Sequence, residues 1–320
     1  MNYERTNNKK NYEIGPYIRR TKLFDDFYGI DKDDGNKVVI RIFPFPYNLS
    51  NEAINRIKNI HNKLGKSIYA QELLECPQDQ GTGITSLIFK YYPKIPLETL
   101  RESGELFYTK FIPSFIYKGI LCLQELRNLK ICHHDICLEN VYFAMENEAS
   151  NNNEKNVNQN PLKFTFKLLN WTFATVAHGN SQSNNMNQNK SLFNTNNTGK
   201  NPNGSMVDER KDHKVAITPR YQYNCNLEDT LTKDPYKRDL WDFAITVLSL
   251  FNEEGIPELL SQIDNKSKIN WIPFLKNYHQ YKEHCQKVKF FFEKVFDLKC
   301  SSEKILIDLI FNDFFTLDFL

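Results

Sequence analysis

The chain has 320 residues, of which 40% are hydrophobic and 25% are charged, and its formal net charge is +2. This length suits one two-lobed domain or two modest ones, and it can bury a substantial hydrophobic core. The near balance of charge and the scattered basic residues argue against binding to nucleic acid or to acidic lipid surfaces.

Three features predict a cytoplasmic protein. Residues 1–10 are polar and lack the apolar core of a signal peptide, and no run of about 18 apolar residues predicts a membrane-spanning helix. The seven cysteines form no metal-type C-x-x-C pair, and their odd number outside a secretory context predicts reduced thiols.

Residues 1–92 predict a β-rich region with one main helix. The turn residues Asp33 to Asn36 precede a β-branched run, and 48–50 offers a helix N-cap before apolar residues recur at helical spacing up to Gly65. Prolines at 93 and 96 mark a break after this region. The strands are expected within 12–30, 37–43, 67–73 and 84–92.

Residues 93–320 predict a larger, mostly helical region. Amphipathic or strongly apolar patterns predict helices at 108–129, 240–251, 288–298 and 304–315. Two stretches, about 147–160 and 179–204, are rich in Asn and Ser and cannot bury enough apolar surface to order themselves. We therefore expect disordered insertions in surface loops there.

The most specific local pattern is ICHHDICLENV at 131–141, between a predicted long helix and a predicted strand. It resembles the catalytic loop of protein kinases, whose pattern is H-R-D-L-x-x-x-N. By this resemblance His133 is the loop histidine, Asp135 the catalytic aspartate and Asn140 the metal-binding asparagine, while His134 replaces the arginine.

Four further landmarks follow in the order of the protein-kinase family. They are VVIR at 38–41, KLLNWT at 167–172, TPRY at 218–221 and YKRDLW at 236–241. The resemblance spans about residues 11–316. It implies an α+β, two-lobed protein-kinase-like fold, with a small β-rich N-lobe at 1–92 and a larger, mostly helical C-lobe at 93–320.

The N-lobe residues that would handle phosphate are altered. The stretch 18–27 stands at the family's glycine-rich loop but contains no glycine, and Asp25 and Asp26 would repel phosphates, so we expect an ordinary solvated hairpin. Arg41 replaces the strand lysine. It keeps the positive charge, but its planar guanidinium is bulkier than the compact lysine ammonium. Its usual glutamate partner is missing, because Glu52 is the only acid in the predicted helix and is out of step with its apolar face.

The C-lobe residues are altered as well. Asn170 replaces the metal-binding aspartate of D-F-G, and an amide brings no charge to Mg²⁺. The resemblance gives Trp171 the packing role of the family phenylalanine, Thr172 removes the glycine, and Cys137 replaces a lysine that neutralises the transferred phosphate. Asp239 is expected to brace backbone amides of the catalytic loop. Asp135 is either vestigial and retained for the same structural reason, or it still orients a substrate hydroxyl.

The resemblance also implies a changed nucleotide pocket. Val39 stands where a small alanine lines the purine, and Phe27 stands where a valine does. Phe89 is the bulky residue before the hinge, and Tyr91 follows within it. The extra volume would fill the nucleotide site, although large side chains also serve as core fillers.

A buried ion pair of the family is absent at both ends. The glutamate of A-P-E and its arginine partner align with Cys225 and Glu303. Loss of both partners is expected where one loss removes the need for the other.

These features leave three hypotheses. The first is a pseudokinase that binds a protein partner, with weak or no ATP binding, no required cofactor and an open oligomeric state. The second is a divergent serine/threonine kinase using ATP and Mg²⁺, with Asp135 as base, Asn140 and Asn170 as metal ligands, and Lys22 or Lys37 replacing the strand lysine. The third is transfer of another group, such as a nucleotidyl moiety.

Overall fold

The computed structural model describes residues 12–21, 23–44, 49–77, 85–93, 101–102, 104–145, 164–177, 234–264, 269–275, 280–297 and 299–311. These residues form an α+β structure that divides into two compact units. Unit 1 lies within Met1–Lys66 and Ala70–Tyr92, and unit 2 lies within Ser67–Tyr69, Pro93–Ala177 and Arg220–Leu320. The predicted insertions at 147–160 and 179–204, the 218–221 motif and Cys225 lie outside the described residues.

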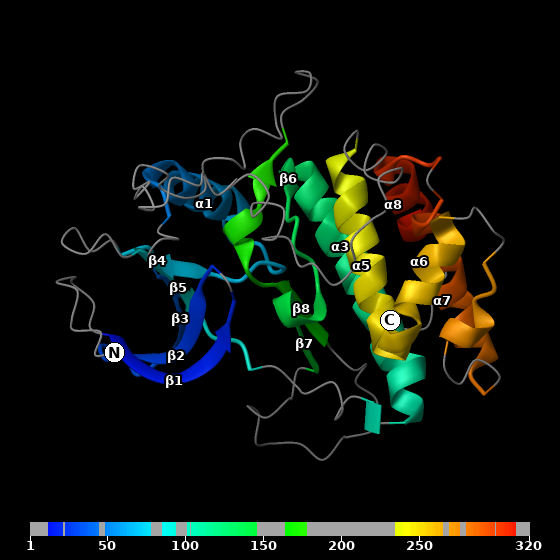
Figure 1. Cartoon of the computed structure of the whole chain (residues 1–320), viewed down its shortest axis with the longest axis horizontal. Helices are drawn as coiled ribbons and strands as arrows, with labels where there is room; N and C mark the ends of the chain where they lie inside the picture. The colour runs from blue at the N-terminus through cyan, green and yellow to red at the C-terminus, as the bar shows by residue number, and fades with distance from the viewer. Residues whose placement is uncertain are drawn as a thin grey trace, which may run out of the picture. The chain divides into compact units, whose positions relative to one another are not determined.

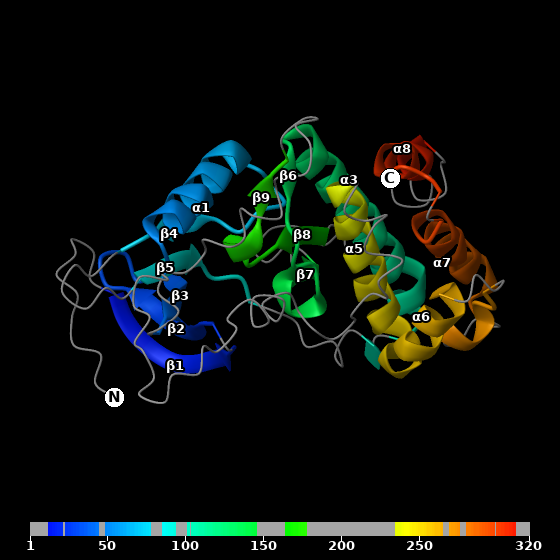
Figure 2. The ribbon, with the colours of Figure 1, turned by 45° about the horizontal axis from the view of Figure 1, so that its top comes forward.

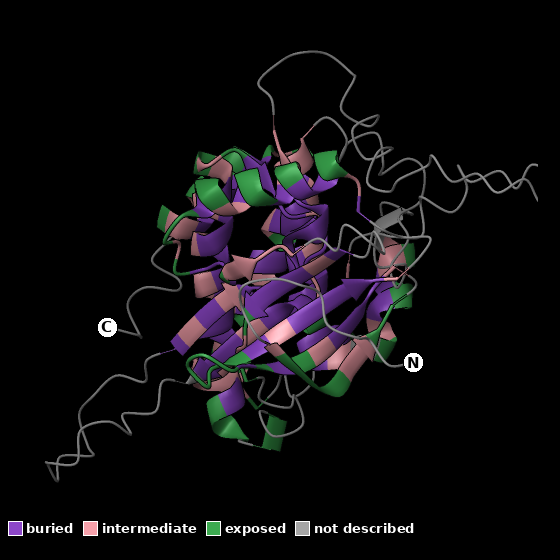
Figure 3. Cartoon of the chain, turned by 90° about the vertical axis from the view of Figure 1, so that its left-hand side faces the viewer, coloured by how far each residue is buried: buried purple, intermediate pink, exposed green. Residues whose placement is uncertain are grey.

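Unit 1 contains a five-stranded antiparallel sheet in the order β1-β2-β3-β5-β4 (Figure 1). The strands are β1 (Tyr12–Arg20), β2 (Asp25–Asp31), β3 (Lys37–Phe43), β4 (Leu73–Glu75) and β5 (Thr85–Lys90). The edge strand β1 is largely exposed, whereas the central β3 is almost entirely buried (Figure 3). The β-branched residues of β3 therefore pack on both faces of the sheet.

One helix, α1 (Asn51–Leu64), lies between β3 and β4 in the chain. The Ser50 side chain accepts the Ala53 N–H at its start, and Gly65 follows its end with φ +52°, as the predicted N-cap and C-terminal glycine require. His61 lies 6.0 Å from the Phe89 ring, so α1 covers the face of the sheet that carries Phe89. Prediction and structure agree for this helix.

The strand predicted at 67–73 is wrong for most of its length, because β4 begins only at Leu73. Ser67 accepts the Tyr69 N–H at 3.1 Å, a side-chain turn that competes with strand pairing. The Tyr69 carbonyl accepts the Leu168 N–H at 2.7 Å, and the Ile68 carbonyl accepts the Lys167 ammonium at 2.7 Å. The segment Ser67–Tyr69 therefore belongs to unit 2.

Unit 2 is built around two helices that run side by side in Figures 1 and 2, α3 (Ile112–Asn128) and α5 (Pro235–Asn252). A π-helical turn, Phe107–Phe111, leads into α3. The two helices approach so closely that a Cβ on Gly119 would lie 2.0 Å from the Phe243 ring. The glycine is therefore required by packing.

The remaining elements of unit 2 are short strands and C-terminal helices. The strands are β6 (Ile131–Cys132), β7 (Val141–Met145), β8 (Phe164–Leu168) and β9 (Thr175–Val176), paired as β6-β9 and β7-β8. The helices are α6 (Ile256–Asp264), α7 (Lys282–Val295) and α8 (Ser302–Phe311), and short 3-10 turns lie at Leu138–Asn140, Trp171–Phe173, Glu253–Gly255 and Ile272–Phe274. None of the described helices combines the length and the hydropathy that a bilayer crossing requires.

Candidate functional site

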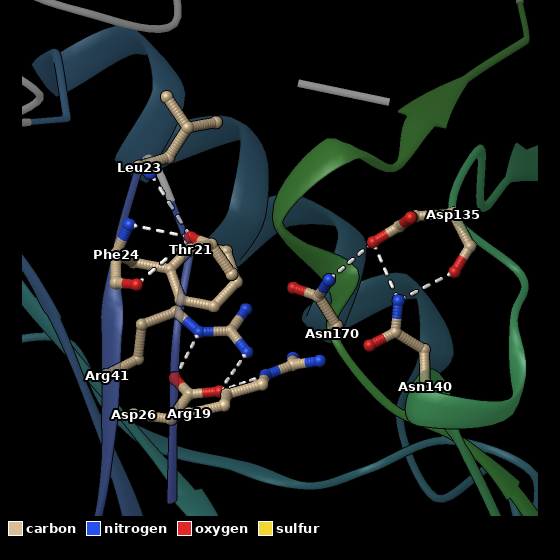
Figure 4. Close-up of polar contacts among 9 residues, drawn as sticks. All are labelled: Arg19, Thr21, Leu23, Phe24, Asp26, Arg41, Asp135, Asn140 and Asn170. Carbon is tan, nitrogen blue, oxygen red and sulfur yellow. Dashed lines mark hydrogen bonds and ion pairs between the residues drawn. The ribbon is translucent and has the colours of Figure 1, made fainter. Parts of the chain in front are cut away.

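The predicted site residues fall into two groups, one in each unit, and Figure 4 draws members of both. Unit 2 holds Asp135, Asn140 and Asn170, and unit 1 holds Phe27, Val39, Arg41, Phe89 and Tyr91.

The loop between β6 and the turn Leu138–Asn140 is shaped by Asp239 of α5. Its carboxylate accepts the His133 N–H at 2.6 Å and the His134 N–H at 2.8 Å, and His134 has φ +64°. Asp239 is only 2% exposed, and burial raises its pKa to about 6 although the two amide bonds act the other way. The expected bracing role of Asp239 is confirmed.

His133 is held inside this loop as a neutral ring. Its Nε2 lies 2.9 Å from the Leu169 carbonyl, and its Nδ1 accepts the Asp135 N–H at 3.3 Å. Because a carbonyl can only accept, the ring proton resides on Nε2. Burial lowers the pKa of His133 to about 4, and the fully buried Trp171 packs edge-on against it at 4.7 Å. This contact agrees with the predicted packing role of Trp171.

Asp135, Asn140 and Asn170 are brought together as a buried cluster. Asp135 Oδ2 accepts Nδ2–H bonds from Asn140 at 2.7 Å and from Asn170 at 2.5 Å. Asn140 also donates to the Asp135 carbonyl at 2.9 Å. The three residues are 6%, 2% and 3% exposed. The two amides thus hold the carboxylate in one orientation.

The backbone at Asn170 explains why an asparagine suits this position. Asn170 has φ +63° and ψ +64°, a left-handed conformation that Asn and Asp tolerate better than other side chains. An aspartate there would also fit the backbone, but its carboxylate would face that of Asp135. The amide replaces this repulsion with a hydrogen bond.

This donor set fits a magnesium ion poorly. Mg²⁺ prefers charged oxygen ligands, whereas the cluster supplies one carboxylate and two neutral amides, and that carboxylate is already hydrogen-bonded to both. Within the part of the chain that the structure describes, no group of three or more His, Cys, Asp or Glu side chains could hold a metal. Cys137, which replaces a lysine of the family, brings no positive charge, and burial raises the pKa of its thiol, so the side chain stays neutral.

In unit 1, Arg41 is engaged by a carboxylate from the neighbouring strand. Its Nε donates to Asp26 Oδ1 at 2.7 Å and its Nη2 to Asp26 Oδ2 at 2.9 Å, and Arg19 Nε donates to Asp26 Oδ2 at 2.8 Å. The strand register places Arg19 and Arg41 opposite Asp26 on either side. The helical glutamate was expected to be missing, and Asp26 on the neighbouring strand is the partner of Arg41 instead.

The surroundings of this ion pair are apolar. The Arg41 guanidinium lies 3.7 Å from the centre of the Phe24 ring, and the Arg41 and Asp26 side chains are 3% and 4% exposed. Burial alone would raise the pKa of Asp26, but Arg41 and Arg19 outweigh burial and hold it below its usual value. The expectation of a solvated hairpin is wrong, because Asp25 and Asp26 are buried and paired with arginines.

The predicted pocket residues do not all share one face. Val39 lies opposite Phe89 and Arg41 opposite Leu87, so Val39, Arg41 and Phe89 share a face. Phe27 lies opposite Ile40 on the other face. Tyr28 takes its place beside Val39 and packs edge-on against Tyr91 at 5.4 Å.

Sequence reasoning missed two residues of this arrangement, Asp26 as the partner of Arg41 and Tyr28 as the residue opposite Val39. The signal for both was the turn that begins after Asp31, because Ile30 pairs with Lys37 across it. Counting back from that pair places Tyr28 beside Val39 and Asp26 beside Arg41.

Glu303, which aligns with the arginine of the family's buried ion pair, lies on the surface. It pairs with Arg127 at 3.0 Å, and the Glu303 and Arg127 side chains are 64% and 24% exposed. The nearby Lys237 is 2% exposed and donates to the Asp297 and Cys300 carbonyls at 2.9 and 2.5 Å. Hydrogen bonds to backbone carbonyls thus anchor this part of unit 2.

A scan against protein-family models gives no match for this chain, and a search of curated proteins gives none either. Function is therefore inferred from the residues and their geometry.

Proposed function

We propose that this chain is a protein-kinase-like domain that has lost efficient phosphoryl transfer and acts by binding a protein partner. The order of its elements supports this relationship: an antiparallel sheet with one helix between β3 and β4 precedes a mostly helical unit. The H-x-D loop of that unit lies between a long helix and a strand. This order agrees with the motif order in the sequence.

The observation that carries the proposal is the buried pair of Arg41 and Asp26. Phosphoryl transfer depends on cations that bind phosphate oxygens and neutralise the charge of the transition state. Arg41 stands where that cation is expected, and two of its nitrogens donate to Asp26 within the unit. Binding a phosphate through these two nitrogens would first require breaking a buried charge pair, which is costly.

The amide cluster of unit 2 supports the same proposal. Asp135 accepts hydrogen bonds from the side-chain amides of Asn140 and Asn170. We therefore expect weak or no binding of ATP and Mg²⁺. We also propose a cytoplasmic location and a protein partner, with neither nucleic acid nor membrane as the binding surface.

Thermal unfolding of the purified chain with ATP or ADP, each with and without Mg²⁺, tests this proposal. A ligand that binds the native state raises the unfolding midpoint, so we expect no shift at millimolar nucleotide. In parallel, transfer of labelled phosphate from ATP should be equal for the wild-type chain and for Asp135→Ala. A Mg²⁺-dependent rise in the midpoint would contradict the proposal.

The second candidate function is a divergent serine/threonine kinase. The observation that favours it is the ordered loop, in which Asp239 fixes the backbone and Asn140 orients Asp135. Asp135 would then act as the base. Lys37, exposed at the start of β3, or Lys22, which lies outside the described residues, would replace the strand lysine. Loss of a measured transfer activity in Asp135→Ala, with the unfolding midpoint unchanged, would favour this candidate.

A further inference from the structure

We propose that Arg19 and Arg41 form an oxyanion-binding site within unit 1, and that the chain's own Asp26 carboxylate occupies it as an autoinhibitory ligand. The inference deepens the proposed function, because it states how the phosphate-handling cation is withdrawn. It concerns contacts within unit 1 alone, so it can be tested without nucleotide.

The geometry around Asp26 is that of a bound anion. Three guanidinium nitrogens from two arginines donate to its two oxygens at 2.7 to 2.9 Å. Arg41 makes two parallel bonds, the fork arrangement by which arginine binds carboxylate and phosphate alike. An external oxyanion would find the same donors if Asp26 were removed.

The charge of the cluster favours an anion with more than one negative charge. Counting only these three side chains, two guanidiniums and one carboxylate leave a net charge of +1. A phosphate dianion in place of the carboxylate would neutralise both arginines. The charge of the two arginines therefore matches a phosphate dianion. The volume now taken by the Asp26 carboxylate matches a formate ion.

The walls of the site are fixed by the β1–β2 turn. The Thr21 hydroxyl donates to the Phe24 carbonyl at 3.0 Å and accepts the N–H groups of Leu23 at 3.1 Å and of Phe24 at 2.9 Å (Figure 4). These bonds hold Phe24, whose ring lies 3.7 Å from the Arg41 guanidinium. An aromatic wall lowers the local dielectric and strengthens an ion pair inside it.

Arg19 provides the route to solvent. Its side chain is 28% exposed, whereas those of Asp26 and Arg41 are 4% and 3% exposed. An incoming anion would meet Arg19 first and reach Arg41 only after displacing Asp26. The neighbouring pair of Arg20 and Asp25 has the same chemistry, but the Arg20 side chain is 74% exposed, so it offers a matched control.

The test is replacement of Asp26 by alanine, which removes the carboxylate and leaves space for formate. We expect the unfolding midpoint of Asp26→Ala to rise by about 5 °C, in a saturable way, with millimolar sodium formate or inorganic phosphate relative to sodium chloride of equal ionic strength. The wild-type chain and Asp25→Ala should show no such rise. The double variant Asp26→Ala with Arg41→Met should also lose the response.

Several outcomes would overturn the proposal. An equal anion response in wild type and Asp26→Ala would mean that phosphate acts by a general salt effect, and no response in Asp26→Ala would mean that the arginines form no site. Should Asp26→Ala fail to fold in chloride, its folded fraction by circular dichroism in formate and in phosphate becomes the readout. Failure of both anions to restore folding then rejects the site, without bearing on nucleotide binding by the wild-type chain.

Discussion

The two units satisfy their buried polar residues in opposite ways. In unit 1 a carboxylate meets two guanidiniums, so charge is balanced by charge. In unit 2 a carboxylate accepts hydrogen bonds from two neutral amides. Each carboxylate is thus bonded by side chains of its own unit, although each group contains residue types that bind phosphate or metal elsewhere.

The largest expected effect comes from breaking the charge pair of unit 1. Arg41→Met should destabilise unit 1 by about 3 kcal/mol, because Asp26 stays buried with one partner fewer. Replacing both residues, Arg41→Met with Asp26→Leu, should recover most of this loss, since a buried pair and an apolar pair are often equivalent. The stability of both variants is measured by unfolding in urea, with hydrogen exchange of β3 peptides as the readout for unit 1.

The surface pair of unit 2 is the control for this experiment. Glu303→Gln removes the partner of Arg127, but the exposure of both side chains should limit the change to about 0.5 kcal/mol. If Glu303→Gln lowered the free energy of unfolding as much as Arg41→Met does, burial would not determine the strength of these ion pairs.

The second effect comes from adding a second negative charge to the Asp135 cluster of unit 2. Asn170→Asp keeps the backbone conformation but places a second carboxylate beside Asp135. We expect a loss of about 2 kcal/mol without divalent cations, because like charges at this separation repel. Millimolar Mg²⁺ should restore the unfolding midpoint, which differential scanning calorimetry measures.

Asn170→Gly is the matched control, since glycine also accepts the left-handed conformation and brings no charge. It should lose the bond to Asp135 and show no response to Mg²⁺. The interpretation of the amide cluster fails if Asn170→Asp is as stable as the wild-type chain in the absence of cations.

The sequence predicted features that depend on local signals and missed those that depend on strand register. Ser50 and Gly65 are next to the helix they delimit, so α1 was predictable. The contact of Asp26 with Arg41 depends on which residues oppose each other across β2 and β3. A shift of one residue moves a side chain to the other face, which is why Phe27 was expected where Tyr28 lies.

The loop of unit 2 was more predictable because its spacing is fixed within the sequence. His133, Asp135 and Asn140 lie on one short segment, and their relation follows from the loop pattern. What the pattern did not predict is that Asn170 donates its amide directly to Asp135. That contact depends on the left-handed backbone of a residue 35 positions away.

The smallest effect is a difference in acid sensitivity between the units. Burial lowers the pKa of His61 in unit 1 and of His133 in unit 2 to about 4, against an ordinary value of 6.5. A lowered histidine pKa stabilises the fold above pH 6.5, and that stability is lost as the pH falls toward 4. As the pH falls from 7 to 5, each histidine should therefore lower the free energy of unfolding by about 2 kcal/mol.

Asp239 acts in the opposite direction, and only in unit 2. Its pKa is raised from 3.8 to about 6, so the folded state binds this proton more readily and gains stability as the pH falls through that window. The gain is about 1 kcal/mol by pH 5, which offsets much of the loss at His133. Asp26, whose pKa lies below its usual value, does not titrate in this range.

Unit 1 should therefore lose hydrogen-exchange protection more steeply than unit 2 between pH 7 and 5, once the rates are corrected for the intrinsic effect of pH. Peptides from β3 report on unit 1, and peptides from α5 report on unit 2. His61→Phe should remove the acid sensitivity of β3, because the aromatic contact with Phe89 is kept while the titrating group is lost. Equal slopes for both units in the wild-type chain would mean that the opposing titrations of His133 and Asp239 do not offset each other.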